Sequence, residues 1–301
     1  MRALMALALL PILGPVSRGL AMIDANGGRA VAEFHLLFNL AVAVVFVGLL
    51  PQVARLLVRL LPQRQLPADP SVPQYLDRDK IDMPAVALTN ASREVLRMAD
   101  VVESMLTGAR AALHEDDRKR IAETAHRDDV VDRLHQELQS YVALIAEQGL
   151  TGEEEQRLSE VQAFAINLEH IGDIIDRNLS ELITKCIRLK LTLSPEGLDE
   201  IDGMFARLLD HLRLAVAVFM SNDVSAARQL VAEKEQFREL ERESTEKHFL
   251  RVRAGNPGSV ETSGLHLDLV RDLKRIDAHL AATAHPLLER TGVLRPTRLA
   301  S

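Results

Sequence analysis

The feature that most constrains the fold is a helical spacing of apolar residues that persists from Pro84 to about Arg290. Apolar side chains recur there at steps of three and four, and no convincing alternating strand pattern interrupts them. The chain is also rich in Ala, Leu, Glu and Arg, which favour helix, and contains no Trp and only two Tyr. We therefore expect an all-α fold over this region.

Capping residues mark the breaks between six expected helices. Thr151 and Glu154 form a capping-box pattern, and Ser194 followed by Pro195 is a typical helix start. Cys186 falls on an apolar helix face and is interpreted as a small core residue. The expected helices span residues 84–114, about 117–148, 151 to about 190, 194 to about 221, from there to 253, and 260 to about 289. Several are long enough to imply antiparallel bundles.

The six helices read as three plus three. When His126–Leu134 is aligned with Glu233–Glu241, charged and apolar residues coincide at most positions, although the match is weak. Leu168–Asp173 pairs with Leu267–Asp272, since in both a Leu precedes an acid and a second acid follows four residues later. Both pairs are separated by a similar stretch of chain, so the sequence predicts a tandem repeat of a three-helix unit.

The segment LEHIGDIID carries three acids, Glu169, Asp173 and Asp176, on one helical stripe that flanks the apolar face. In the last expected helix, Asp268 and Asp272 share a stripe in the same way. A solvated face would tolerate such spacing, because like charges one turn apart cost only a few tenths of a kcal/mol. Clustered carboxylates also suit Mg²⁺, Mn²⁺, Fe or Zn²⁺. The two interpretations stay open.

The N-terminal part differs from the rest of the chain. Phe34–Leu50 is almost wholly apolar and lies near the lower length limit for a transmembrane helix. Arg55, Arg59 and Arg64 follow it, which favours a cytoplasmic end on that side. The alternative is a buried helix of a soluble protein. Ala3–Pro15 is a shorter apolar stretch, to be interpreted as a signal peptide, a short span, or the end of a span whose beginning is missing.

Four prolines separate the apolar end from the helical region. A basic amphipathic stretch, Val53–Leu61, comes before them and suits the lipid headgroups. The prolines, at positions 62, 67, 70 and 73, exclude a continuous helix. The expected organisation is a membrane segment (1–61), a linker (62–83), a helical domain (84–290) and a tail (291–301).

On these motifs the helical region resembles the PhoU family, whose members regulate phosphate uptake and consist of two three-helix bundles. The resemblance implies that E/D-x-x-x-D motifs bind clusters of metal ions. Glu169 and Asp173 match that motif in the first unit, and Asp268 and Asp272 match it in the second. Asp176 matches a recurrent acid, whereas Ala278 stands where an acid is expected in the second unit. The expected cofactors are divalent or iron-type metal ions on these stripes, and otherwise none.

The apolar end resembles the last span of bacterial sodium/phosphate cotransporters, with His35, Phe38 and Asn39 in an H-x-x-F-N pattern. Proteins of that family often carry a PhoU-like domain after this span. Their transport core has two repeats with a Gln-Ser-Ser-Ser motif, and no QSSS occurs in this chain. The chain therefore resembles the C-terminal portion of such a transporter, with the transport core absent. No residue is assigned to phosphate or sodium.

Two functions follow from the resemblance. One is a sodium-dependent phosphate transport protein, of which this chain supplies the last span and a cytoplasmic regulatory domain. The other is a membrane-tethered PhoU-like regulator of phosphate uptake. The expected partners are a transporter membrane domain, from the same gene or in trans, the plasma membrane, and a second copy. No GxSxG, Walker A, HExxH or Rossmann motif favours an enzyme, and the net charge of −7 disfavours nucleic acid.

Overall fold

A computed structural model describes residues 35, 36, 39, 69–115 and 118–292. The chain divides into two compact units, residues 1–68 and 69–301. In the first unit His35, Leu36 and Asn39 are helical, and the Asn39 amide donates a 2.8 Å hydrogen bond to the backbone oxygen of His35. Phe38 and the rest of the expected span lie outside the described residues. Among the helices that the structure describes, none combines the length and the hydropathy needed to cross a bilayer.

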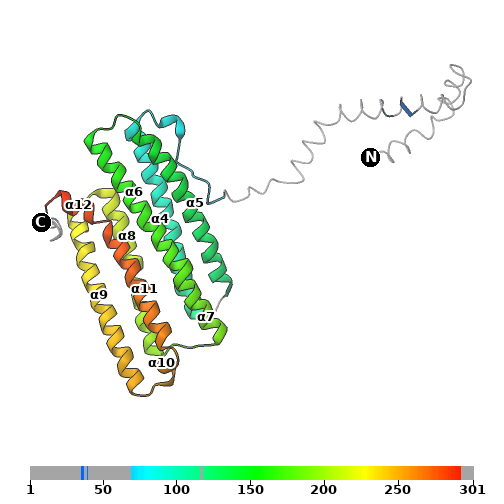
Figure 1. The fold of residues 1–301 in the computed structure, drawn as a ribbon, viewed down its shortest axis with the longest axis vertical. Coiled ribbons are helices and arrows are strands. Elements are labelled where there is room, and N and C mark those ends of the chain that lie inside the picture. Colours follow the sequence, from blue (N-terminus) through cyan, green and yellow to red (C-terminus); the bar gives the residue numbers. More distant parts are fainter. Residues whose placement is uncertain (1–34, 37–38, 40–68, 116–117, 293–301) are drawn as a thin grey trace, which may run out of the picture. The chain divides into compact units, whose positions relative to one another are not determined.

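The second unit is built from long helices (Figure 1). They are α4 (Pro84–Glu115), α5 (Arg118–Ala146), α6 (Gly152–Asp173), α7 (Glu181–Leu189), α8 (Pro195–Ser221), α9 (Val224–Arg253), α10 (Pro257–Glu261), α11 (Ser263–Ala282) and α12 (His285–Arg290). A 3-10 helix, η2 (Arg78–Lys80), precedes them, and a π-helix, η3 (Ile174–Ser180), joins α6 to α7. The described residues contain no strand, so the expected all-α fold is confirmed for them.

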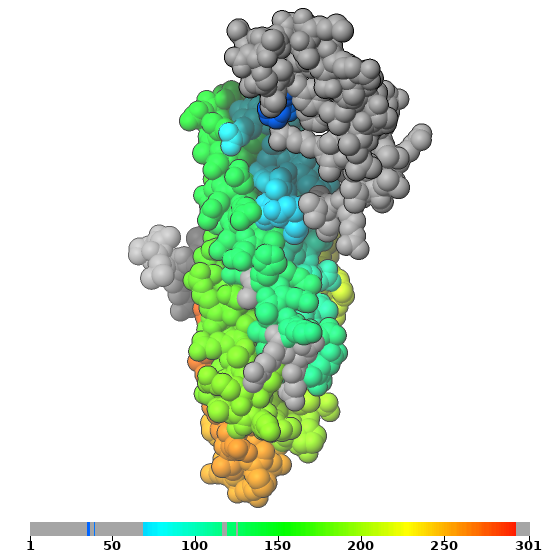
Figure 2. Space-filling view, turned by 90° about the vertical axis from the view of Figure 1, so that its right-hand side faces the viewer, coloured from blue at the N-terminus to red at the C-terminus, as the bar shows by residue number. Residues whose placement is uncertain are grey.

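The long helices form two three-helix bundles. α4, α5 and α6 pack together, as do α8, α9 and α11, and the bundles meet where α4 packs on α8 and α6 on α11. Figure 1 shows these helices side by side along the long axis of the unit, and the turn from α9 into α10 forms one end of it (Figure 2). The observed grouping is the one that the repeat in the sequence predicts.

Buried apolar side chains of the two bundles form one connected core. The side chains in the interior of the first include Leu134, Leu138, Tyr141, Phe164, Leu168 and Ile171. Those in the second include Phe205, Leu208, Phe237, Leu269, Leu273 and Ile276. Cys186 is buried, as expected of a small core residue. Because the apolar stripes of α5 and α6 face this interior, acids beside those stripes come to the seam between the two helices.

The capping box expected at the start of α6 is confirmed. The Thr151 hydroxyl accepts from the N–H of Glu154, and the Glu154 carboxylate accepts from the N–H of Thr151 at 2.8 Å. Thr151→Ala is therefore expected to lower the free energy of unfolding by about 1 kcal/mol, as measured by urea denaturation. Thr107→Ala is the matched control, because Thr107 lies inside α4 and bonds only the Glu103 carbonyl of its own helix. A larger loss in the control would contradict the prediction.

The last expected helix, from 260 to about 289, is divided twice in the structure. Its first residues belong to α10, which ends at Glu261 before α11 begins at Ser263, and α11 ends at Ala282 before α12 begins at His285. Pro286 explains the second break, because it has no N–H to donate and its ring would clash with the carbonyl of Ala282 in a continuous helix. The expectation of one helix is corrected on this point. The third expected helix runs its full length, but with a π-helix inside it.

The end of the expected linker packs on the first bundle. The buried Glu94 carboxylate of α4 accepts from the N–H groups of Gln74 and Tyr75 at 2.9 and 2.8 Å. Tyr141 of α5 donates to the carbonyl of Asp77 at 2.9 Å. Residues 69–83 therefore belong to the packed unit, and not to a linker that extends to 83.

Candidate functional site

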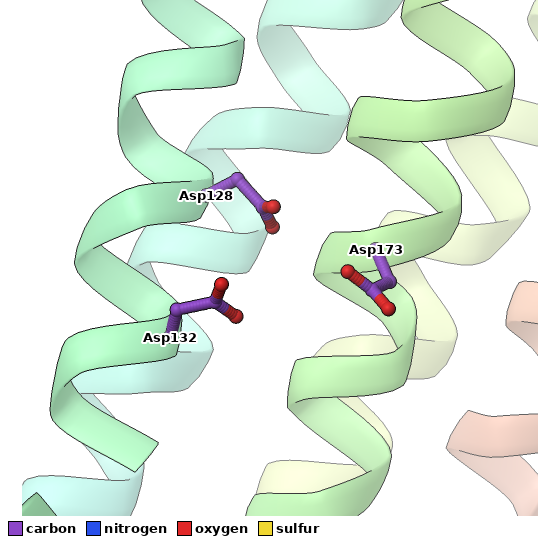
Figure 3. Close-up of side chains that lie close together, drawn as sticks. All are labelled: Asp128, Asp132 and Asp173. Atoms are coloured by element: carbon purple, nitrogen blue, oxygen red, sulfur yellow. The ribbon is translucent and has the colours of Figure 1, made fainter. Parts of the chain in front are cut away.

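Three carboxylates meet between α5 and α6. Asp128 and Asp132 lie one turn apart on α5, and Asp173 is the last residue of α6. Each offers one oxygen, and these oxygens all lie within 4.8 Å of one another. Figure 3 shows the three side chains pointing into the same gap between the two helices. We call these three residues the acidic cluster.

The register between α5 and α6 extends this acidic seam. The helices are antiparallel, so Asp128 lies against Gly172 while, further along α5, His135 lies near Glu169. Asp176, in the π-helix, is close enough to Asp128 to raise the pKa of that carboxyl. Acids of both helices therefore line the seam on either side of the acidic cluster.

Gly172 makes room for the buried carboxylate of Asp128. A Cβ at position 172 would lie 2.7 Å from Oδ1 of Asp128, closer than such atoms approach in real structures. It would also contact Val131 at 3.6 Å and Met105 at 3.9 Å. The absence of a side chain at Gly172 is thus what allows Asp128 to reach the seam from α5.

Burial and mutual repulsion raise the pKa values of these acids. Asp128 is only 6 % exposed, and burial, followed by the charges of Asp132, Asp176 and Asp173, raises its pKa to about 7. Burial also raises the pKa of Asp132, with Asp173 as the next cause, and it raises the pKa of Asp176. The cluster is therefore poorly compensated, and a cation placed there would relieve the repulsion.

Arg177 is a cation beside the seam. Its Nη2 lies 2.9 Å from Oδ1 of Asp173, and its charge lowers the pKa values of Asp128, Asp132 and Asp176. The contact is an ion pair whose geometry directs no N–H at that oxygen. Oδ1 of Asp173 therefore accepts no hydrogen bond from any described residue, although it is buried. The same is true of Oδ1 of Asp128, which Arg177 does not pair with.

The donor set fits a hard cation. Carboxylate oxygens are the ligands that Mg²⁺, Mn²⁺ and Ca²⁺ prefer, and they also serve iron. Two buried oxygens without a hydrogen bond are a cost that coordination would remove. Three carboxylates from two helices could hold one such ion, and the acids along the seam could hold more.

Of the site residues predicted from the sequence, the structure places only some in or near the acidic cluster. Asp173 belongs to the acidic cluster. Glu169 lies one turn away, with its carboxylate 3.6 Å from the His170 ring, and Asp176 lies in the π-helix. In the second bundle, Asp268 pairs with Arg271 at 2.7 Å.

Asp272 is fully buried in the second bundle and has guanidinium partners. It accepts from Arg271 and from Arg275, whose shortest hydrogen bonds to it are both 3.1 Å. Asp268 and Asp272 are thus neutralised by arginines. Among the described residues they belong to no group of three metal-ligating side chains.

Asp128 and Asp132 are candidate ligands that the sequence analysis did not name. Their D-x-x-x-D spacing lies within His126–Leu134, a segment that served there only as evidence for the repeat. A single-helix argument shows that both share a face of α5, but not that this face meets Asp173. The D-x-x-x-D spacing on the second expected helix was the signal in the sequence that could have identified Asp128 and Asp132 as candidate ligands.

The comparison with known families agrees with the two-bundle fold. The model of the PhoU domain matches residues 95–182 and 201–285, which is more than half of the chain. The chain belongs to the PhoU domain family. Its two matched segments correspond to the two bundles, α4 to α7 and α8 to α11.

Relatives extend this similarity over the N-terminal part. A Salmonella typhimurium protein named "Putative inorganic phosphate export protein YjbB" is 34 % identical over 95 % of this chain. This chain spans 52 % of that protein, or about half its length. A Thermotoga maritima protein named as a PhoU homologue, an accessory protein of a phosphate-specific transport system, is 26 % identical over 64 % of this chain and 82 % of its own length.

A solved structure supports the fold. The crystal structure of PhoU from Pseudomonas aeruginosa superposes with a TM-score of 0.62 at 16 % identity, and covers 69 % of this chain and 98 % of that one. At this identity the similarity concerns the fold alone. The predicted PhoU-like pair of three-helix bundles is confirmed in that sense.

Proposed function

We propose that this chain is a PhoU-like regulatory part of a phosphate transport system, and that its acidic cluster binds divalent cations. The observation that carries the first part is the similarity to a relative named for phosphate export, which continues through the N-terminal residues that precede the PhoU domain. The partner would be the membrane domain of a phosphate transporter, in the same polypeptide or in trans, and the helical domain would act at its cytoplasmic side.

Of the two functions predicted from the sequence, the regulator has the stronger support. The matching family and the Thermotoga relative are both named for PhoU, and that relative is named as an accessory protein. Neither relative's name mentions sodium. Membership of the sodium/phosphate cotransporter family, and the span around His35, Phe38 and Asn39, therefore stay predictions.

Deleting the coding region in the source organism tests the transport role. Uptake and release of radioactive phosphate are then measured after a shift from low to high phosphate. We expect a changed rate in one direction, which the full chain restores and the Asp128→Asn, Asp132→Asn double variant does not. Unchanged rates in both directions would contradict the proposed role in phosphate transport.

The metal proposal rests on the geometry of Asp128, Asp132 and Asp173, with Glu169 and Asp176 as neighbouring acids. The chain's own contribution is to hold these carboxylates together at a cost in repulsion and burial. A bound cation would supply charge neutralisation, and it would compete with Arg177 for Asp173. Metal binding at Asp268 and Asp272 stays a weaker prediction, because arginines already neutralise both.

Gly172→Ala separates the metal site from general stability. The added methyl group would displace the Asp128 carboxylate from the seam, so we expect the affinity for Mn²⁺ to fall at least about tenfold in calorimetric titration. Gly203→Ala is the matched control: Gly203 lies in α8, and a methyl group added there would meet no neighbouring atom within 4 Å. It should bind Mn²⁺ as the wild type does and gain stability by about 0.5–1 kcal/mol. Equal Mn²⁺ affinity in the three chains would contradict the proposed site.

A further inference from the structure

A groove lies beside the acidic cluster, between the π-helix and α11. Six polar or charged side chains line it, and Ile174 forms part of its apolar wall. The six are His170, Asp173, Arg177, Asn178, Arg275 and His279. Because α11 packs against α6 and the π-helix, the groove takes its side chains from both bundles.

The groove holds two arginines whose donors are only partly used. Arg275 is half-exposed and donates one hydrogen bond, from Nη1 to Asp272. Asp272 is shared with Arg271, so two guanidinium groups divide one buried carboxylate. Arg177 is two-thirds exposed, and its one ion pair with a described residue is that with Asp173. Each guanidinium carries five N–H groups in a plane that suits the oxygens of a phosphate.

The remaining polar side chains add neutral hydrogen-bonding groups. The side-chain amide of Asn167 donates to the Ala163 carbonyl at 2.8 Å, so its oxygen faces Nδ1 of His279, 3.0 Å away. Nδ1 of His279 therefore carries the hydrogen of that bond, and Nε2 of the neutral ring is an acceptor that could receive a hydrogen bond from a P–OH group. The ring of His170 lies 5.1 Å from that of His279, and Asn178 adds an amide.

The charges of Asp173 and Arg177 determine when the groove can bind an anion. Without a cation in the acidic cluster, Asp173 lines the groove as a carboxylate and holds Arg177. A divalent cation bound by Asp173 would neutralise that carboxylate and release the guanidinium. The same event thus neutralises a repulsive charge in the groove and frees the N–H groups of Arg177 for an anion.

We propose that this groove binds inorganic phosphate, and that cations in the acidic cluster strengthen the binding by releasing Arg177 from Asp173. The inference rests on the proposed metal site and adds its anionic ligand. By thermodynamic linkage, phosphate must strengthen cation binding by the same factor. The chain would then respond to phosphate and divalent cation together.

The test is calorimetric titration of the full chain with inorganic phosphate, in chelator and with saturating Mn²⁺. We expect phosphate to bind about 5–150-fold more tightly with Mn²⁺, the usual range for coupled sites. Arg177→Gln should weaken phosphate binding while leaving Mn²⁺ binding equal or stronger, because the competing guanidinium is gone. A merely structural role for Arg177 would weaken both.

Further variants keep the test decisive. Arg275→Gln and Asn178→Ala should each weaken phosphate binding. Arg242→Gln should not, because Arg242 has an exposure between those of Arg275 and Arg177 but pairs within α9, outside the groove. Circular dichroism excludes a folding defect. Dimethyl phosphate, an analogue of a lipid phosphodiester, should compete more weakly than phosphate, and stronger competition would overturn the assignment to free phosphate.

The outcomes separate this inference from the metal proposal. Mn²⁺ binding without phosphate binding would overturn the groove and leave the metal site standing. Phosphate binding of equal strength with and without Mn²⁺ would overturn the coupling through Arg177. A chain that binds no Mn²⁺ would overturn the metal site itself.

Discussion

Asp128→Asn is expected to stabilise the metal-free chain at pH 8 by on the order of 4 kcal/mol. This figure corresponds to the difference between a pKa of about 7 in the folded chain and the ordinary value of 3.8. An acid whose pKa is raised by folding costs almost nothing below about pH 3, where it is protonated in both states. The cost grows as the pH rises and is complete above about pH 7. Urea denaturation in chelator between pH 4 and 8 measures it.

Two comparisons test whether this effect comes from the acidic cluster. Asp210→Asn is the control, because the Asp210 side chain is 71 % exposed on α8, and it should leave the slope of stability against pH unchanged. Mn²⁺ at a hundred times its dissociation constant should stabilise the wild type by about 2.7 kcal/mol and Asp128→Asn by much less. If Asp128→Asn and the wild type have the same free energy of unfolding at pH 8 in chelator, the acidic cluster carries no such repulsion.

On the acid side, His266 is expected to contribute a loss of about 3 kcal/mol to the free energy of unfolding between pH 6.5 and pH 4. In the metal-free wild type this loss opposes the gain from protonation of Asp128, so it is measured in the Asp128→Asn chain. The His266 ring is 1 % exposed, and burial, followed by the nearby charge of His248, lowers its pKa to about 4. Folding therefore keeps His266 neutral, while the unfolded chain takes up a proton below pH 6.5. This contribution to stability is fully present above pH 6.5 and is lost as the pH falls towards 4.

The contacts of His266 explain why its charging is costly. Its ring stacks on that of His248 at 4.4 Å, and Nε2 lies 3.1 Å from the Ser244 hydroxyl. Arg251 and Glu200, whose closest pair of atoms is 2.7 Å apart, add a fixed positive and a fixed negative charge.

In the Asp128→Asn background, His266→Gln should flatten the loss of stability below pH 6.5, whereas His126→Gln, at an exposed ring, should not. If the His266 variant does not fold, NMR titration of the wild-type ring replaces it. A ring that charges near pH 6.5 would contradict the prediction.

The fold was predictable because apolar spacing and caps are local signals. Thr151, Glu154 and Ser194 mark helix starts that the structure reproduces. The break at Pro286 has an equally local cause, although the apolar spacing continues across it. Grouping of the helices into two bundles followed from the repeat, and needed no knowledge of any contact between helices.

The candidate site was only half predictable. Asp173 could be found from its own helix, but its partners come from α5, and the register between two helices depends on how their interiors pack. Gly172 illustrates the difficulty. Its role is to leave space for Asp128, a residue 44 positions earlier in the chain, and nothing in the local sequence indicates this.

The π-helix between Asp173 and Glu181 also has a consequence for comparing this protein with others. Each hydrogen bond in such a segment spans one residue more than in an α-helix, so the turn accommodates one extra residue. Removing a single residue from Ile174–Ser180 would let α6 and α7 join as one regular helix without displacing the ends of either. A one-residue gap in an alignment at this place would therefore mark the presence or absence of the π-helix in a homologue, at a position where gaps within helices are usually treated as errors.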